Sequence, residues 1–207
     1  VVVNVNPLYT PRELEHQLKD SGAEAIIVLE NFATTVQQVM GKTALKHVIV
    51  GSMGDLLGFK GVIVNLVVRK VKKMVPAYDL PGQVKFKAAL AEGRGKTLQS
   101  VAVSPSDVAF LQYTGGTTGV SKGATLTHSN ILSNIAQNSS WLKPVFDNRG
   151  LPQDLTFICA LPLYHIFALT VCMMMGMDLG GKNVLIPNPR DIPAFVKMIS
   201  HEKLHIF

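Results

Sequence analysis

Residues 113–123 combine small, hydroxyl-bearing and cationic side chains in a pattern that suits the binding of an anion. The string reads Tyr113-Thr114-Gly115-Gly116-Thr117-Thr118-Gly119-Val120-Ser121-Lys122-Gly123. Its four glycines let backbone N–H groups approach an anion closely, and four Thr and Ser hydroxyls add hydrogen-bond donors. Lys122 adds a positive charge near the end of the string. The segment is therefore a candidate phosphate-binding loop.

The phosphates of ATP are a ligand that such a loop can hold. Around the β- and γ-phosphates it would stabilise the negative charge that builds on a pyrophosphate leaving group, and the Thr114 hydroxyl could ligate Mg²⁺. It is not a Walker loop, because Gly-Lys-Thr at residues 95–97 is preceded by Leu90 where the first glycine is required. The alternative interpretation is a surface loop that is merely rich in small residues.

A second candidate segment places a phenol and an imidazole in an otherwise apolar stretch. It reads Leu161-Pro162-Leu163-Tyr164-His165-Ile166-Phe167. A histidine in such surroundings is more often a hydrogen-bonded core residue than a functional one. Taken alone, His165 therefore predicts no chemistry.

The flanking pattern changes this interpretation. The string at 113–123 closely resembles the phosphate-loop signature of the adenylate-forming superfamily, which includes acyl-CoA synthetases, luciferases and peptide-synthetase adenylation domains. The segment 161–167 looks like that family's second core motif, whose aromatic and histidine side chains border the acyl site. Residues 6–15 and 188–193 are further similar to bacterial long-chain fatty-acid–CoA ligases. That extent of similarity favours long-chain acids over other substrates.

The resemblance implies a two-step reaction with ATP, Mg²⁺ and coenzyme A. A fatty carboxylate attacks the α-phosphorus of ATP to give acyl-AMP and pyrophosphate, and the coenzyme A thiol then displaces AMP. Tyr164 and His165 are the implied substrate-site residues, and Thr114 is the implied metal ligand. The implied nucleotide-binding residues are Tyr113, Thr114, Gly115, Gly116, Thr117, Thr118, Gly119, Lys122 and Gly123.

Other motifs of the family are not found after residue 167. These are the acid that supplies a second ligand for Mg²⁺ near the phosphates, the aspartate that binds the ribose, and the catalytic lysine of a mobile C-terminal domain. We therefore assign no catalytic residue, interpret the chain as a fragment of a longer protein, and expect it to be inactive alone. The alternatives are another adenylate-forming enzyme, such as a fatty-acyl-AMP or aryl-CoA ligase, and a non-catalytic nucleotide- or lipid-binding module.

Apolar periodicity and turn residues predict an α/β fold, with parallel sheets and helices packed on both faces, as part of a large N-terminal acyl-CoA synthetase-like domain. A capping box at Thr10 opens a helix that ends at Gly22, and a continuous apolar run at 25–29 predicts a buried strand. Residues 1–75 are expected to form one α/β segment of this AMP-binding domain, 76–100 a connecting segment, and 101–207 the phosphate-loop and acyl-site segment. The other predicted strands are 47–50, 108–112, 156–160 and 183–186, and the other predicted helices are 31–40, 128–142, 163–178 and 191–201.

Composition limits the setting of the protein. A net charge of +6 suits an anionic partner such as a nucleotide, a coenzyme or an acidic lipid surface. The two cysteines, Cys159 and Cys172, form no metal-ligand or disulfide pattern, which favours the cytoplasm. We expect small-molecule substrates and no nucleic acid, and we leave a homodimer open.

Residues 55–75 alternate apolar and basic side chains, as a helix that lies on a lipid surface would. We favour an ordinary helix that packs its apolar stripe inside the protein, and keep peripheral contact with the inner membrane face as the alternative. The longer apolar stretch 155–179 contains Pro162, His165 and Asp178, so we expect a core strand and helix there and no membrane span.

Overall fold

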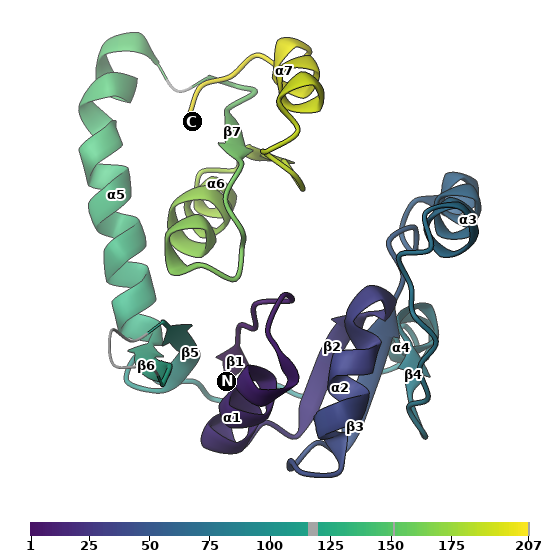
Figure 1. Cartoon of the computed structure of the whole chain (residues 1–207). Coiled ribbons are helices and arrows are strands. Elements are labelled where there is room, and N and C mark those ends of the chain that lie inside the picture. Colours follow the sequence, from purple (N-terminus) through teal and green to yellow (C-terminus); the bar gives the residue numbers. More distant parts are fainter. Residues whose placement is uncertain (116–119, 151, 207) are drawn as a thin grey trace. The chain divides into compact units, whose positions relative to one another are not determined.

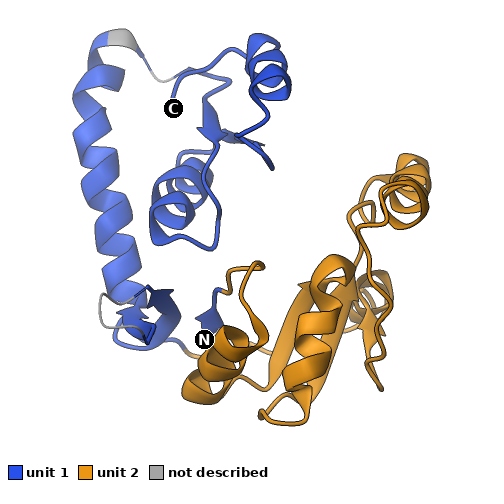
Figure 2. Cartoon of the chain, viewed as in Figure 1, with its two compact units in different colours: residues 1–4, 103–207 blue, residues 5–102 orange. Residues whose placement is uncertain are grey.

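The computed structural model describes residues 1–115, 120–150 and 152–206, apart from the side chain of Arg149. The chain divides into two compact units, one of residues 1–4 with 103–207 and the other of residues 5–102 (Figure 2). Each unit is an α/β assembly in its own right. The division into segments 1–75, 76–100 and 101–207 of one domain stays a prediction.

A parallel sheet forms the centre of the unit 5–102. Its strands are β2 (Ala25–Leu29), β3 (His47–Gly51) and β4 (Val84–Lys85), in that order. Helix α1 (Pro11–Ser21) begins at the predicted capping box, in which Thr10 and Glu13 exchange hydrogen bonds, and ends at Gly22 with a left-handed φ of 63°. Helix α2 (Ala33–Met40) follows a short 3₁₀ turn, η1 (Glu30–Phe32), and lies beside β2 and β3 (Figure 1).

Helices cover both faces of this sheet to different extents. Helices α1 and α2 bury Val48 and Val50 of β3 in one apolar core. On the opposite face, α4 (Phe86–Gly93) starts close to Gly51, where an added Cβ would lie 3.6 Å from the Cβ of Phe86. The buried core consists of Leu14, Leu18, Ala33, Val36, Val39, Leu45, Val48, Val50 and Leu80.

Strand β2 is only half buried, which corrects the prediction of a fully buried strand. Its residues alternate between the core and the opposite face, as strand geometry requires, and Ile27 is 67% exposed. The continuous apolar run identified the strand correctly but did not show that only one of its faces is covered in this unit.

The segment 55–75 forms helix α3 (Gly58–Leu66) and a π-helical turn, η2 (Val67–Val71). The prediction that its apolar stripe packs inside is wrong for this unit, because Phe59, Val62, Ile63 and Leu66 are exposed. The helix docks through its other face instead.

The second unit contains two small sheets. In the first, β1 (Val2–Val3) runs parallel to β5 (Val108–Thr114), and β5 pairs antiparallel with β6 (Lys122–Thr127). Helix α5 (His128–Arg149) follows, opened by a capping box between Thr127 and Asn130. It extends beyond the predicted 128–142.

The second sheet of this unit pairs β7 (Thr156–Cys159) in parallel with β8 (Lys182–Leu185). The π-helical η3 (Ala168–Met174) and α6 (Met175–Asp178) connect the two strands, and α7 (Ile192–Ser200) is capped by Asp191, the residue predicted to open it. Phe157 and Met175 are fully buried, so the strand and the helix of the stretch 155–179 contribute to the core as expected, while Leu161, Phe167 and Met177 within it are exposed. Within the described residues, no helix has the length and apolar character needed to cross a membrane.

Both cysteines are buried in this core. Burial, together with the neighbouring Cys159, raises the pKa of the Cys172 thiol to about 11. A thiol that stays protonated at neutral pH is a poor nucleophile, so Cys172 acts as a core residue.

Candidate functional site

A β-hairpin holds the two ends of the candidate phosphate loop together. In the register of β5 and β6, Thr114 lies opposite Lys122, and Tyr113 lies opposite Gly123. These four residues are strand residues, which corrects the prediction that the loop extends over all of 113–123. The loop is shorter because ladder pairing satisfies the backbone groups at both of its ends. Gly116, Thr117, Thr118 and Gly119 lie outside the described residues.

The contact between the two strands near the loop explains why residue 123 is a glycine. The Tyr113 side chain is buried and crosses to the opposite strand, where a Cβ added at Gly123 would lie 3.0 Å from two atoms of the Tyr113 ring. A larger residue would displace the ring and change the path of the strand that leads into the loop. Tyr113 and Gly123 therefore act as support for the loop in this structure.

Thr114 and Lys122 are both exposed at the end of the hairpin. A hydroxyl and an ammonium group are thus placed on neighbouring strands, at the point where the glycine-rich residues begin and end. Strand neighbours of this kind have Cβ atoms about 5 Å apart, a separation that one phosphate group can span. The pair suits the binding of a phosphate oxygen by donors of two kinds.

Gln112 connects the loop strand to the second candidate segment, a contact that sequence reasoning missed. Its side chain is 5% exposed. Its Nε2 donates to the carbonyl oxygen of Tyr164 at 2.7 Å, and its Oε1 accepts a hydrogen bond from Nδ2 of Asn4 at 3.4 Å. The structure therefore brings the two predicted segments together, although they lie about fifty residues apart. A polar side chain within the apolar strand 108–112 was the one signal available in the sequence.

We expect Gln112→Leu, in the full-length protein that contains this chain, to weaken substrate handling more than stability. The change leaves the Tyr164 carbonyl without this donor, which costs about 1–2 kcal/mol of folding free energy. It also frees the turn that carries His165, so we expect kcat/KM for the acid substrate to fall about tenfold. Steady-state kinetics and thermal unfolding measure both effects. Gln112→Glu keeps the size of the side chain but replaces the donating Nε2 by an acceptor, so it should lose at least as much activity. Unchanged kinetics in Gln112→Leu would contradict a positioning role.

The second segment is a tight turn between β7 and the following helix, so this helix begins later than the predicted residue 163. The His165 N–H donates to the Pro162 carbonyl at 2.9 Å, and the His165 carbonyl accepts from the Leu169 N–H at 3.0 Å. The ring Nδ1 of His165 accepts the Phe167 N–H at 3.4 Å, which orients the imidazole and leaves Nε2 to carry the proton of the neutral ring. His165 is exposed, so the core-histidine alternative is wrong, while Tyr164 is half-buried.

The described residues can contribute to a metal site only in part. No group of three or more His, Cys, Asp or Glu side chains able to hold a metal ion occurs among them. The exposed Thr114 hydroxyl at the end of β5 fits one ligand position of a hard cation such as Mg²⁺. Such an ion would need its other oxygen ligands from phosphates or water.

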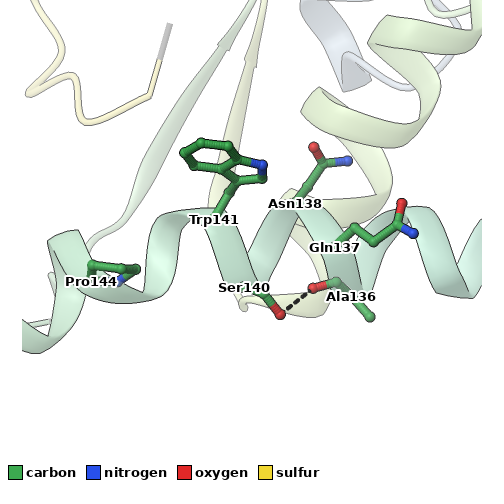
Figure 3. Close-up of a pocket in the computed structure, with 6 residues that line it drawn as sticks. All are labelled: Ala136, Gln137, Asn138, Ser140, Trp141 and Pro144. Carbon is green, nitrogen blue, oxygen red and sulfur yellow. Dashed lines mark hydrogen bonds between the residues drawn. The ribbon is translucent and has the colours of Figure 1, made fainter.

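A surface depression along α5 is a poor candidate for the site. It has a volume of about 700 Å³ and is lined by Ala136, Gln137, Asn138, Ser140, Trp141 and Pro144 (Figure 3). These residues come from a single helix, and the Ser140 hydroxyl is taken up by the Ala136 carbonyl at 2.8 Å. The lining carries no charged group that would attract a nucleotide. The hairpin and the turn at 161–167 are therefore the better candidate.

Known proteins with similar sequences place these residues in context. The family model described as AMP-binding enzyme matches residues 1–207. The long-chain-fatty-acid–CoA ligase of Escherichia coli O6:H1 is 52% identical over 201 residues, which cover 97% of this chain and 35% of that protein. The chain thus spans about a third of the length of the curated relatives it matches.

Solved structures share the fold. The anthranilate CoA ligase AuaEII, in complex with anthranoyl-AMP, superposes with a TM-score of 0.71 at 23% identity, over 99% of this chain and 34% of that chain. A long-chain-fatty-acid–CoA ligase from Archaeoglobus fulgidus gives a TM-score of 0.59 at 25% identity, over 96% of this chain and 33% of that chain. The family match over the whole chain and this shared fold lead to one conclusion: the chain belongs to the family of AMP-binding enzymes.

Proposed function

We propose that the full-length protein is a long-chain fatty-acid–CoA ligase that works through an acyl-adenylate. The observation that carries this proposal is the hydrogen bond from Gln112 to Tyr164, because it joins the candidate phosphate hairpin to the candidate acyl-site turn. The 52% identity to a relative of that name supports the substrate class. Fatty acid and ATP would give acyl-AMP and pyrophosphate, and coenzyme A would then give acyl-CoA and AMP.

The hairpin serves the first of these steps. The Lys122 ammonium and the Thr114 hydroxyl would bind the β- and γ-phosphates, and backbone N–H groups of the glycine-rich residues between them would complete the cradle. Mg²⁺ bound to the phosphates supplies further neutralisation of their charge, with the Thr114 hydroxyl as its protein ligand. Gly115, Gly116, Thr117, Thr118 and Gly119 belong to this proposed cradle.

The turn at 161–167 serves the acid. The Tyr164 side chain and the oriented His165 imidazole would border the acyl group near its carboxylate, at a fixed separation from the hairpin. Because the chain spans about a third of its relatives' length, we propose that catalysis requires the full-length protein and that these 207 residues alone are inactive.

We propose that the protein acts on small-molecule substrates in the cytoplasm and contacts the inner membrane face peripherally. A homodimer is compatible with this proposal. The net charge of +6 supports a partner of negative charge. The exposed apolar residues of α3 are the candidates for the membrane contact.

Isotope exchange between ATP and pyrophosphate tests the proposed function. The full-length protein is supplied with short-chain, long-chain and aromatic carboxylates in turn, with coenzyme A left out. We expect exchange that depends on the acid and is at least tenfold faster with long-chain acids. Exchange with aromatic acids alone would indicate an aryl-CoA ligase, and no exchange with any acid would indicate a non-catalytic binding module.

A further inference from the structure

Helix α3 docks onto its unit through small and polar residues. Gly61 meets Gly54 so closely that a Cβ added at Gly61 would lie 1.8 Å from the Gly54 carbonyl oxygen. One turn later, the Asn65 side chain accepts the Gly54 N–H at 2.8 Å. Val68 of η2 is buried one turn further along. These residues recur at intervals of three to four and define the docked face.

An ion pair fixes the end of this segment. The Arg69 guanidinium donates to both carboxylate oxygens of Glu30, at 2.7–3.0 Å, and to the Ser52 hydroxyl at 2.9 Å. Glu30 and Ser52 follow the ends of β2 and β3, so the pair ties η2 to the edge of the sheet. The orientation of α3 is therefore set by specific contacts at both of its ends.

The face opposite the docked one is apolar and exposed. Phe59, Val62, Ile63 and Leu66 follow the spacing of a single helical stripe, and Phe59 and Leu66 are 82% and 59% exposed. An ordinary surface helix buries such a stripe and turns its polar face to water. Here the face that carries Gly61, Asn65 and Val68 is docked, and the more strongly apolar face is presented outward.

Basic side chains accompany this apolar stripe along the chain, one within it and four just after it. Residues 56–78 contain five basic residues, Lys60, Arg69, Lys70, Lys72 and Lys73, and no acidic residue. Apart from Arg69, none of these is paired with a carboxylate among the described residues. A second copy of the chain is a poor partner for this surface, because face-to-face packing would bring two such clusters of positive charge together.

We propose that α3 and η2 form a membrane-surface element that binds anionic lipid. Phe59, Val62, Ile63 and Leu66 enter the boundary between headgroups and acyl chains, and the lysines contact lipid phosphates. The segment 58–71 is about 21 Å long at 1.5 Å per residue, too short to span a bilayer, so it lies along the surface. This proposal rests on the peripheral membrane contact included in the proposed function, and it names the residues that make that contact. Lipid binding itself does not require ligase activity.

Vesicle co-sedimentation of the full-length protein tests this surface. Phosphatidylcholine vesicles with and without about one third phosphatidylglycerol serve as probes, and neither ATP nor fatty acid is present. We expect binding to the anionic vesicles only. Phe59→Ser with Leu66→Ser should weaken it at least tenfold, and each of Lys70→Ala and Lys72→Ala about fivefold.

Matched controls lie elsewhere in the same unit. Leu98→Ser removes an exposed apolar side chain and Lys85→Ala an exposed cation, and both should bind as the wild type does. Circular dichroism confirms that each variant is folded. Failure of the wild-type protein to bind, or equal binding by all variants, would overturn the proposal. So would a dimer that only the Phe59 and Leu66 changes dissociate, since a second copy would then cover this face. Because no substrate is present, loss of ligase activity cannot imitate any of these outcomes.

Discussion

Replacing Lys122 by alanine in the full-length protein is expected to lower acid-dependent ATP–pyrophosphate exchange about 100-fold, and replacing Thr114 should have a similar effect. The two residues lie opposite each other across β5 and β6, at the start and end of the glycine-rich loop. A charged donor and a hydroxyl directed at the departing pyrophosphate act most strongly while negative charge is building there. The loss should therefore appear mainly in kcat.

Two controls separate this effect from damage to the hairpin. Thr125→Ala removes an exposed hydroxyl from the same strand, one that faces Leu111 across the ladder, and should exchange at the wild-type rate. Lys122→Arg keeps the charge and should recover part of the activity. If both alanine variants at the loop ends exchange within threefold of the wild type, the hairpin does not hold the phosphates.

The second large effect concerns the ion pair beneath α3. Arg69→Ala leaves the Glu30 carboxylate, which is 5% exposed, without its bidentate partner. Removing one partner of a buried pair is strongly destabilising, but the Arg69 side chain is itself 45% exposed, so we expect a loss of about 2–3 kcal/mol. Hydrogen bonds to Glu30 raise the pKa of Arg69 above its already high value, so the guanidinium stays charged.

Thermal unfolding of the full-length protein measures this loss. A shift of about 2–3 °C is expected for Arg69→Ala, because the unfolding entropy grows with chain length and the curated relatives are about three times as long as this chain. Lys70→Ala removes the neighbouring exposed cation and should unfold within about 1 °C of the wild type, by the same scaling. Arg69→Lys keeps the charge without the bidentate geometry and should fall between them. Hydrogen exchange that stays unchanged over residues 58–75 in Arg69→Ala would show that the ion pair does not hold this helix.

Locally determined features of the fold were predictable from the sequence. The start of α1 depends on Thr10 and Glu13, which are three residues apart, and its end depends on Gly22, so a short stretch of sequence contains the full signal. Asp191, the N-cap residue, similarly predicts the start of α7. The loop string was found because its residue types are unusual over a short span, whereas the segment 161–167 was found through its resemblance to a family motif.

Features that depend on distant partners were not predictable in the same way. Glycine and threonine content indicates a loop at 113–123, yet pairing between β5 and β6 extends the strands to Thr114 and Lys122. The partner of Gln112 lies 52 residues away, and nothing near Gln112 identifies it.

The orientation of α3 is the clearest example of this limit. The spacing of Phe59, Val62 and Leu66 shows that an apolar stripe exists, but not which face of the helix docks. That choice depends on the Gly54–Gly61 approach and on the pair between Glu30 and Arg69, which are 39 residues apart. Periodicity alone therefore led to the opposite orientation.

The most direct test of adenylation is to identify the products formed without coenzyme A. The full-length protein is incubated with Mg-ATP and a long-chain acid such as palmitate, and the mixture is analysed by mass spectrometry. We predict fatty-acyl-AMP and pyrophosphate in equal amounts, converted to acyl-CoA and AMP when coenzyme A is added. Formation of ADP and phosphate, or of no product that depends on the acid, would contradict the proposed function.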